Sequence, residues 1–229
     1  MAKNDFSAES AENYEQKCLC VLVLDVSGSM RGEPINELNK GLQEFYREVS
    51  EDETTSQRLE VSIMTFNESV ETLQEPALVD NFTMPTLTAY GSTAMCDGVN
   101  EAIDKVEARK KWYKETGQKY YRPVIILMTD GEPDDGQDVN GLAARIKNGV
   151  ESKKFAFFSV GIEGANMQTL QTLQNGKAPV KLSGLKFKSF FQWLSASFGD
   201  TVKPPTSEPV DFDGVFSDID WGAYEIGVD

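Results

Sequence analysis

The sequence of 229 residues contains no histidine. This absence excludes hydrolases that use a histidine base and metal sites built on histidine ligands. Basic residues are also scarce, with 22 Lys and Arg against 37 Asp and Glu, which gives a net charge of −15 at pH 7. A chain with this charge is repelled by the phosphates of nucleic acids and by anionic lipid. We therefore expect no nucleic acid and no membrane among its main partners.

Long apolar runs are lacking as well. The longest one, Cys18 to Leu24, has seven residues, whereas a membrane-spanning helix needs about 20. The first 17 residues are polar and lack the order of a signal peptide, a basic stretch followed by an apolar one. The three cysteines, an odd number, favour buried free thiols in a reducing compartment. These features predict a cytoplasmic protein.

Composition divides the chain into three parts. Residues 1–16 are rich in small and acidic residues with little periodicity, and we expect a flexible or loosely packed arm. Residues 17–199 have the patterns of one folded domain. Residues 200–229 form an acidic tail with eight acidic residues and one lysine, together with several aromatic residues. The charge of the tail is typical of disorder, whereas its apolar residues favour binding to a partner or to a second copy of the domain.

Strand and helix patterns alternate through the domain. Apolar runs predict strands at 18–25, 59–66, 70–73, 123–129, 155–162 and 180–182. Apolar residues at steps of three and four predict helices at 34–49, 94–113, 142–150, 167–173 and 189–198. The connection at 67–69 is so short that it allows only an antiparallel hairpin. We expect an α/β, Rossmann-like, doubly wound fold: a mostly parallel six-stranded sheet with one antiparallel edge strand and helices on both faces.

Two of the buried strands end in a carboxylate that a glycine-bearing loop follows. Asp25 ends the first of these strands, and Asp130 directly follows the strand at 123–129. In open α/β sheets, ligands bind outside the carboxyl ends of the strands, so these two side chains converge if their strands are neighbours. Ser27 and Ser29, two residues apart, would present their hydroxyls to the same side. Oxygen ligands of this kind suit a hard cation such as Mg²⁺, although an aspartate at such a position can also simply cap a helix or loop.

The pattern resembles the metal-ion-dependent adhesion site (MIDAS) of von Willebrand factor A domains. The resemblance extends from about residue 17 to residue 198 and rests on five residues in the family's order: Asp25, Ser27, Ser29, Thr93 in YGSTA, and Asp130 in LMTDGEP. It implies that the three hydroxyls bind the metal directly, while the two carboxylates act largely through bound water. Mg²⁺ is the implied cation, with Mn²⁺ or Ca²⁺ as alternatives.

The implied function is binding and not turnover. Neutral inner ligands leave the metal electrophilic, with a position open for an Asp or Glu carboxylate of a protein partner. Three stretches, SGSMRGEPINELNKGL, LTAYGST and TDGEPDD, further resemble the bacterial TerY/YegL group. That group is associated with tellurium-resistance and stress operons, some of which encode PP2C-type phosphatases and protein kinases. The resemblance therefore implies a stress-response or phospho-signalling system, with such a phosphatase or kinase as a candidate partner.

Other interpretations remain open at this point. A subunit of an ATPase or chelatase-type assembly would use the same five residues. A metal-dependent aspartyl phosphohydrolase would use Asp25 as its nucleophile, but such enzymes typically carry a second carboxylate two residues later, where this chain has Ser27. The segment 105–122, with seven basic and two acidic residues among aromatic ones, fits nucleic acid, an acidic protein surface or the solvated end of a helix. Cys96 is either a redox thiol or a small buried apolar residue.

Overall fold

The computed structural model describes residues 4–6, 9, 13–162 and 164–182. The strands are β1 (Cys18–Asp25), β2 (Leu59–Phe66), β3 (Val70–Leu78), β4 (Val124–Thr129), β5 (Ala156–Gly161) and β6 (Val180–Lys181). The α-helices are α1 (Glu33–Glu51), α2 (Glu53–Arg58), α3 (Met95–Thr116), α4 (Val139–Glu151) and α5 (Met167–Leu173). The helix expected at 189–198 and the acidic tail at 200–229 lie outside the described residues.

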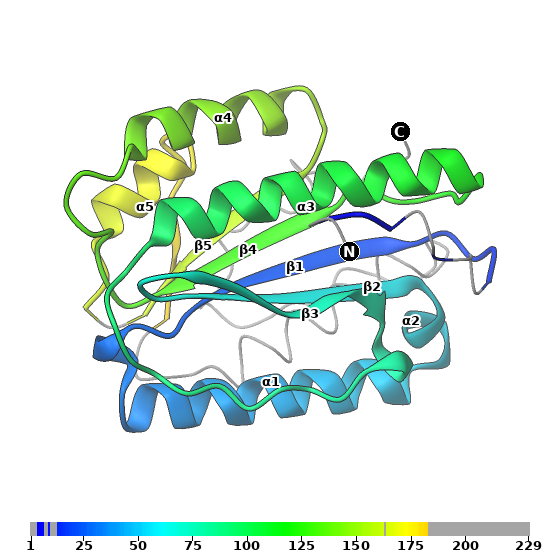
Figure 1. Ribbon diagram of the computed structural model, residues 1–229, viewed down its shortest axis with the longest axis horizontal. Coiled ribbons are helices and arrows are strands. Elements are labelled where there is room, and N and C mark those ends of the chain that lie inside the picture. Colours follow the sequence, from blue (N-terminus) through cyan, green and yellow to red (C-terminus); the bar gives the residue numbers. More distant parts are fainter. Residues whose placement is uncertain (1–3, 7–8, 10–12, 163, 183–229) are drawn as a thin grey trace.

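The strands form one six-stranded sheet in the order β3-β2-β1-β4-β5-β6. All neighbouring pairs are parallel except β2 and β3, which are antiparallel. Their tight turn is closed by Asn67, whose N–H donates to the Ser69 carbonyl at 3.0 Å and whose Oδ1 accepts from the Ser69 N–H at 3.0 Å. Helices α3 and α4 lie on one side of the sheet and α1 on the other (Figure 1). The expected fold class is confirmed, including its antiparallel edge strand.

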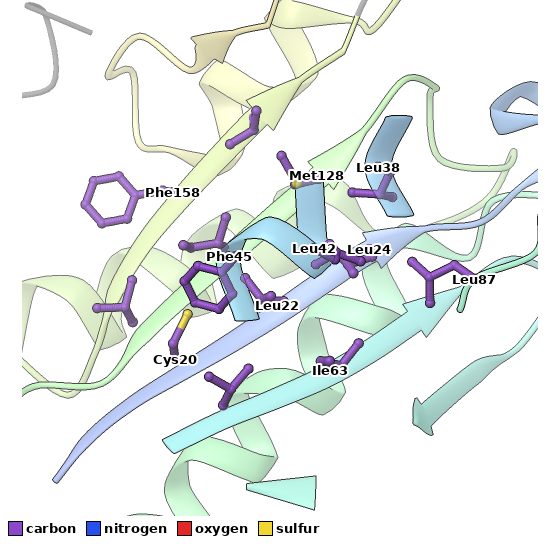
Figure 2. Packing of buried hydrophobic residues seen from close by; sticks show 14 of the residues in the cluster. Cys20, Leu22, Leu24, Leu38, Leu42, Phe45, Ile63, Leu87, Met128 and Phe158 are labelled. Atoms are coloured by element: carbon purple, nitrogen blue, oxygen red, sulfur yellow. The ribbon is translucent and has the colours of Figure 1, made fainter. Parts of the chain in front are cut away.

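The central strand β1 is buried on both faces, as its continuous apolar run predicts. Cys20, Leu22 and Leu24 point to one side and pack with residues of α1 such as Leu42 and Phe45 (Figure 2). Alternate residues of a strand point to opposite faces, so the odd-numbered residues of β1 fill the core under α3 and α4. The apolar clusters on the two faces of the sheet pack against β1 and β4 from both sides. This packing fixes the positions of the loops that follow these two strands.

Two elements differ from the expectations. Strand β3 runs to Leu78, five residues beyond the predicted end, because Pro76 lies in an edge strand, where its missing N–H costs no sheet hydrogen bond. Helix α2 was not predicted. Its N-cap is Asp52, whose Oδ1 accepts from the N–H of Thr55 at 2.8 Å, but the polar residues that follow it give no apolar periodicity.

The substitution Gly149→Ala tests how closely α4 packs on the sheet. A Cβ at residue 149 would stand 2.3 Å from Cε1 and Cζ of the buried Phe155 ring. Overpacking of this kind costs about 1–3 kcal/mol, against a gain of roughly 1 kcal/mol in helix propensity. We expect a net loss of about 1–2 kcal/mol in the free energy of unfolding, measured by urea denaturation. The exposed neighbour Asn148→Ala is the control and should not destabilise; equal stability of both variants would contradict this packing.

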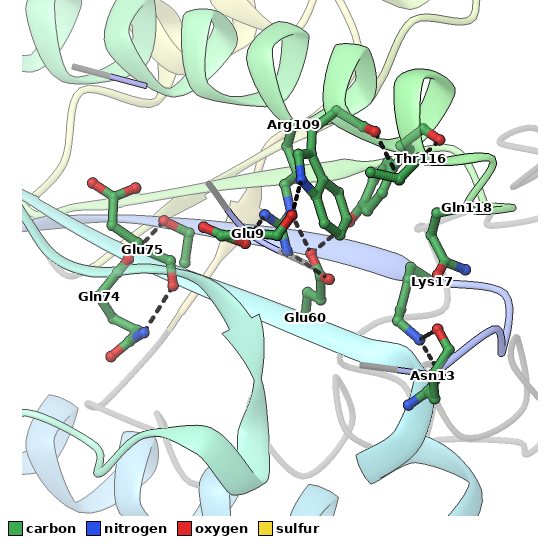
Figure 3. Close-up of polar contacts among 12 residues, drawn as sticks. Glu9, Asn13, Lys17, Glu60, Gln74, Glu75, Arg109, Thr116 and Gln118 are labelled. Atoms are coloured by element: carbon green, nitrogen blue, oxygen red, sulfur yellow. Dashed lines mark hydrogen bonds and ion pairs between the residues drawn. The ribbon is translucent and has the colours of Figure 1, made fainter. Parts of the chain in front are cut away.

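The described part of the segment 1–16 contacts the domain at the end away from the loops that follow β1 and β4. Phe6 is buried beside Trp112 of α3, and the Glu9 carboxylate pairs with Arg109 at 2.5 Å (Figure 3). The side chain of Asn13 accepts a short hydrogen bond from Lys17. These contacts join the described residues of the segment to α3 and to the start of β1.

The basic segment 105–122 is turned largely inward. Four of its seven basic side chains are buried: Lys105, Arg109, Lys110 and Arg122. Lys105 pairs with Glu75 at 2.7 Å, and Arg122 donates to the backbone carbonyls of Val150 and Phe155. The interpretation as the solvated end of a helix is therefore wrong for these four residues, and they cannot belong to a continuous cationic surface.

Candidate metal centre

The candidate ligands lie on loops at the carboxyl ends of β1 and β4, which are neighbours at the point where the strand order reverses. The register pairs Leu24 with Met128, so Asp25 and the residue after Met128 lie side by side. The strands that follow β1 and β4 are then added on opposite sides, which opens a crevice at this edge. The predicted neighbourhood of Asp25 and Asp130 is confirmed by this topology.

Asp25 is fully buried, and both of its carboxylate oxygens are held. Oδ1 accepts from the Ser27 N–H at 2.8 Å, and Oδ2 accepts from the Thr129 hydroxyl at 2.5 Å. Burial raises the pKa of the Asp25 carboxyl, the hydrogen bonds from Ser27 and Thr129 oppose this rise, and the charge of Asp130 adds to it. Burial and the neighbouring Asp130 both disfavour the charged form of Asp25. A bound cation would offset this unfavourable free energy.

A chain of hydroxyls joins the loop after β1 to Asp130. The Oγ atoms of Ser27 and Ser29 are 2.9 Å apart, and the Ser29 hydroxyl donates to Asp130 Oδ1 at 2.8 Å. Ser27 is buried and Ser29 is exposed, so the chain leads from the interior to the surface. The spacing of two residues therefore does bring both hydroxyls to one side.

Thr93 borders the same space from a third loop. A carbon placed on Gly131 would stand 3.8 Å from Thr93 Oγ1 and 3.9 Å from Asp25 Oδ2. The loop that carries Thr93 is tied to the other loops, since Gly28 N–H donates to the Gly91 carbonyl at 3.0 Å. Gly131, Thr93 and Asp25 therefore lie next to one another, with the Thr93 hydroxyl and an Asp25 oxygen toward Gly131.

Two residues of the loop after β4 hold Thr93 in place. Asp134 Oδ2 accepts from the Thr93 N–H at 2.9 Å, and the Asp134 N–H donates to the Thr93 carbonyl at 3.1 Å. Gln137 donates to the same carbonyl at 2.6 Å and accepts from the N–H of Cys96 at 2.7 Å. Neither Asp134 nor Gln137 is among the five residues on which the resemblance rests. No local pattern marks these two residues, because their partners lie 41 or 44 positions earlier.

Thr129 was also missed, although the sequence carries a signal for it. Asp25 and Thr129 are the last residues of two apolar strands. If the strands are aligned by their carboxyl ends, the two side chains point to the same face of the sheet. The hydroxyl beside the buried carboxylate follows from that alignment.

The donor set consists of oxygen atoms alone: three hydroxyls and two carboxylates. Among the described residues, no three His, Cys, Asp or Glu side chains are grouped so that they could hold a metal ion by themselves. A cation at this edge of the sheet would therefore depend on Ser27, Ser29 and Thr93. Hydroxyl and carboxylate oxygens suit Mg²⁺, Mn²⁺ or Ca²⁺ better than softer metals, so the residues present fit the expected cation.

Asp134→Ala should weaken metal binding without removing a candidate ligand. Loss of the acceptor for the Thr93 N–H frees the loop that positions the Thr93 hydroxyl. Substituting groups that orient ligands typically lowers metal affinity about 10- to 100-fold. We expect a loss in this range in a Mg²⁺ titration, and a much smaller one for the exposed neighbour Asp135→Ala. Equal losses would mean that only the charge of the loop matters.

Cys96 has the environment of a packing residue. It is 3% exposed at the start of α3, and burial raises the pKa of its thiol to about 11. All three cysteines are buried and form no disulfide. A thiol with so high a pKa is poorly reactive near neutral pH, which favours the apolar interpretation over the redox one.

Comparison with protein families gives one match. The model of the von Willebrand factor type A domain matches residues 20–191, about three quarters of the chain. No curated protein is similar in sequence at a significant level. Within the described residues, no helix has the length and apolarity needed to cross a membrane.

Solved structures share the fold at low sequence identity. The pilus adhesin SpaC of Lactobacillus rhamnosus GG aligns with 82% of this chain at 12% identity and a TM-score of 0.65. The PilB minor pilin of Streptococcus sanguinis aligns with 87% at 13% identity and a TM-score of 0.58. Proximal thread matrix protein 1 from the mussel byssus, with a zinc-occupied MIDAS motif, aligns with 87% at 18% identity and a TM-score of 0.52. The chain covers 31%, 65% and 50% of those three proteins.

Proposed function

The chain belongs to the von Willebrand factor type A domain family, and on that premise we propose that it is a metal-dependent protein-interaction module. One observation carries the proposal: three separate loops bring Ser27, Ser29, Thr93 and the two aspartates to one space at the carboxyl edge of the sheet. A solved structure of the same fold, that of proximal thread matrix protein 1, has a zinc-occupied MIDAS motif and supports a divalent cation there.

In this proposal, Ser27, Ser29 and Thr93 would hold the cation, and Asp25 and Asp130 would supply negative charge beside it. When bound, the cation would supply an electrophilic centre for a carboxylate of the partner. Mg²⁺ is the proposed ion, on the grounds of the oxygen-only donor set and its abundance in cells. Hydrogen bonds within the chain hold the three loops and the Asp25 carboxylate in place, so that the site is formed before the partner arrives.

The geometry around Asp25 supports binding over catalysis. Its carboxylate is fully buried, and each oxygen already accepts a hydrogen bond at 2.8 Å or less. A nucleophile needs a free oxygen that can approach the substrate. An aspartyl phosphohydrolase that uses Asp25 is therefore disfavoured, and we propose that the chain is not an enzyme.

The cellular system is the finer part of the proposal. The resemblance to the TerY/YegL group supports a bacterial stress-response or phospho-signalling role, with a PP2C-type phosphatase or a protein kinase as partner. The three buried, unpaired cysteines support a cytoplasmic location. An ATPase or chelatase-type assembly differs only in the identity of the partner.

The proposal is tested by purifying the full chain from its own cells, in parallel with Mg²⁺ and with EDTA. We expect a protein that co-purifies with Mg²⁺ and is lost with EDTA, and its identity would distinguish a signalling partner from an ATPase. A partner that is fully retained in EDTA would contradict binding through the metal.

A further inference from the structure

A small cavity lies beside the candidate metal centre, under the loop that leads to Thr93. Its volume is about 110 Å³, and its lining residues include Val26, Glu71, Leu73 and Tyr90. Val26 lies between Asp25 and Ser27, and its carbonyl accepts from the Tyr90 N–H at 2.8 Å. The cavity and the metal centre therefore share the loop after β1 and the loop before α3.

The cavity has an apolar side at the surface. Only three large apolar side chains are strongly exposed among the described residues, and two of them, Leu73 at 41% and Tyr90 at 45%, line this cavity. An aromatic ring and a leucine at the mouth of a hollow favour contact with a partner side chain.

The other side of the cavity carries negative charge. Glu71 lines it, and no Lys or Arg does. The Glu68 carboxylate lies against the backbone next to Tyr90, since a Cβ on Gly91 would stand 3.1 Å from Glu68 Oε2. Both glutamates are exposed, and within the described residues no ion pair is formed by either. Glu71 therefore lines the cavity, and Glu68 lies against the adjoining loop next to Tyr90, with no ion pair to either carboxylate among the described residues.

The surroundings are acidic too. In segments 26–33, 67–69, 86–97 and 130–138, which surround the site, acidic residues outnumber basic ones by eight to one, and Arg31 is the single cation. A partner that offers a carboxylate must approach through this negative potential, which disfavours an acidic peptide. A cation near the partner's carboxylate would offset the repulsion.

We propose that this cavity is a subsite for a lysine or arginine side chain of the partner, next to the carboxylate that binds at the metal. The inference rests on the proposed function and names the chemistry of the partner: an acidic residue with a basic neighbour. The methylenes of the basic side chain lie along Leu73 and Tyr90, and its charge lies near Glu68 and Glu71 and over the Tyr90 ring.

The size of the cavity favours one side chain over a small molecule. A volume of 110 Å³ corresponds to about four waters at roughly 30 Å³ each. Sites for cofactors and metabolites are typically about 300–1,000 Å³. A long, thin side chain with an apolar stem and a charged end matches both the volume and the lining.

The test uses the full chain and a library of peptides with a central Asp or Glu and three randomised positions on each side. Binding is selected with 5 mM MgCl₂ and with EDTA. We expect Lys or Arg to be enriched roughly threefold to tenfold at one or more flanking positions, the size of an exposed ion pair plus a cation–π contact. The variant Glu68→Gln plus Glu71→Gln should lose this enrichment and keep the requirement for the central acid.

A matched control removes the same charge elsewhere. Glu53 and Asp80 are exposed at the other end of the molecule, at the start of α2 and after β3. Glu53→Gln plus Asp80→Asn should keep the enrichment, and Glu68→Lys plus Glu71→Lys should reverse it toward acidic residues. Enrichment of apolar residues alone, or none, would overturn the subsite while the function stands. A library with no Mg²⁺-dependent need for the central acid would overturn both.

Discussion

The double substitution Ser27→Ala plus Ser29→Ala should abolish the stabilisation that Mg²⁺ gives to the folded chain. The two hydroxyls are 2.9 Å apart, and Ser29 also donates to Asp130, so the change removes two candidate ligands and the link to a third residue. Loss of groups that only orient ligands already costs about 10- to 100-fold in affinity. We expect a loss of at least about 100-fold when two direct ligands are removed.

Thermal unfolding measures this effect. A ligand at 100 times its dissociation constant stabilises the native state by about 2.7 kcal/mol, which is roughly 5–10 °C in Tm for a domain of this size. The wild type should show a rise of this order with Mg²⁺, and the double variant should show almost none. Ser50→Ala plus Ser152→Ala, the same chemistry far from the site, should behave like the wild type. A double variant at 27 and 29 that still responds fully to Mg²⁺ would mean that these serines are not ligands.

The substitution Glu60→Ala should destabilise the fold strongly and leave metal binding intact. Glu60 is 3% exposed at the start of β2, and its two oxygens accept from Nε and Nη2 of Arg109, both at 2.9 Å (Figure 3). Burial raises the pKa of the Tyr113 phenol, and the charge of Glu60 raises it further, so its hydroxyl stays protonated and donates to Glu60 at 2.6 Å. Among the described residues, removing Glu60 leaves the buried Arg109 with the half-exposed Glu9 as its one remaining ion-pair partner.

Breaking a buried ion pair by removing one partner typically costs about 3–5 kcal/mol. For a domain of this size, that corresponds to a fall of roughly 6–20 °C in Tm. Lys111→Ala, which removes only an exposed pair 3.7 Å from Glu115, is the control and should change Tm by 1–2 °C at most, because such pairs contribute little. The Mg²⁺-dependent rise in Tm should persist in Glu60→Ala, because Glu60 lies at the start of β2 and the candidate metal centre lies at the other end of the strands. Wild-type stability of this variant would contradict the account of the cluster.

Much of the fold could be predicted because its signals are local. The run from Cys18 to Leu24 is entirely apolar, which predicts a strand buried on both faces of a sheet. The turn at 67–69 is so short that it permits only a hairpin. Helix α5 occupies the predicted residues because its apolar spacing is regular. Helix α2 and the end of β3 were missed because a short polar helix and a half-exposed edge strand have weak patterns.

The residues of the candidate site could be predicted from the sequence, but the hydrogen bonds that hold its loops in place could not. Strand ends and spacing suffice to bring Asp25, Ser27 and Asp130 together. The hydrogen bonds of Asp134 and Gln137 to the Thr93 loop depend on the exact course of two loops that are distant in sequence. The same holds for Arg109 of α3, which is buried and pairs with Glu60 of β2, 49 positions earlier. Its sequence neighbours therefore gave the wrong impression of a solvated surface.

The central claim is that these three loops hold one divalent cation, and titration of Mn²⁺ followed by electron paramagnetic resonance tests it most directly. Only free Mn²⁺ gives the sharp six-line signal, so bound ions are counted as lost intensity, and Mg²⁺ should displace them. The account predicts one competed ion per chain in the wild type and none in Ser27→Ala plus Ser29→Ala, with any weak binding to the acidic tail equal in both. Equal binding by the two proteins at every concentration would contradict it.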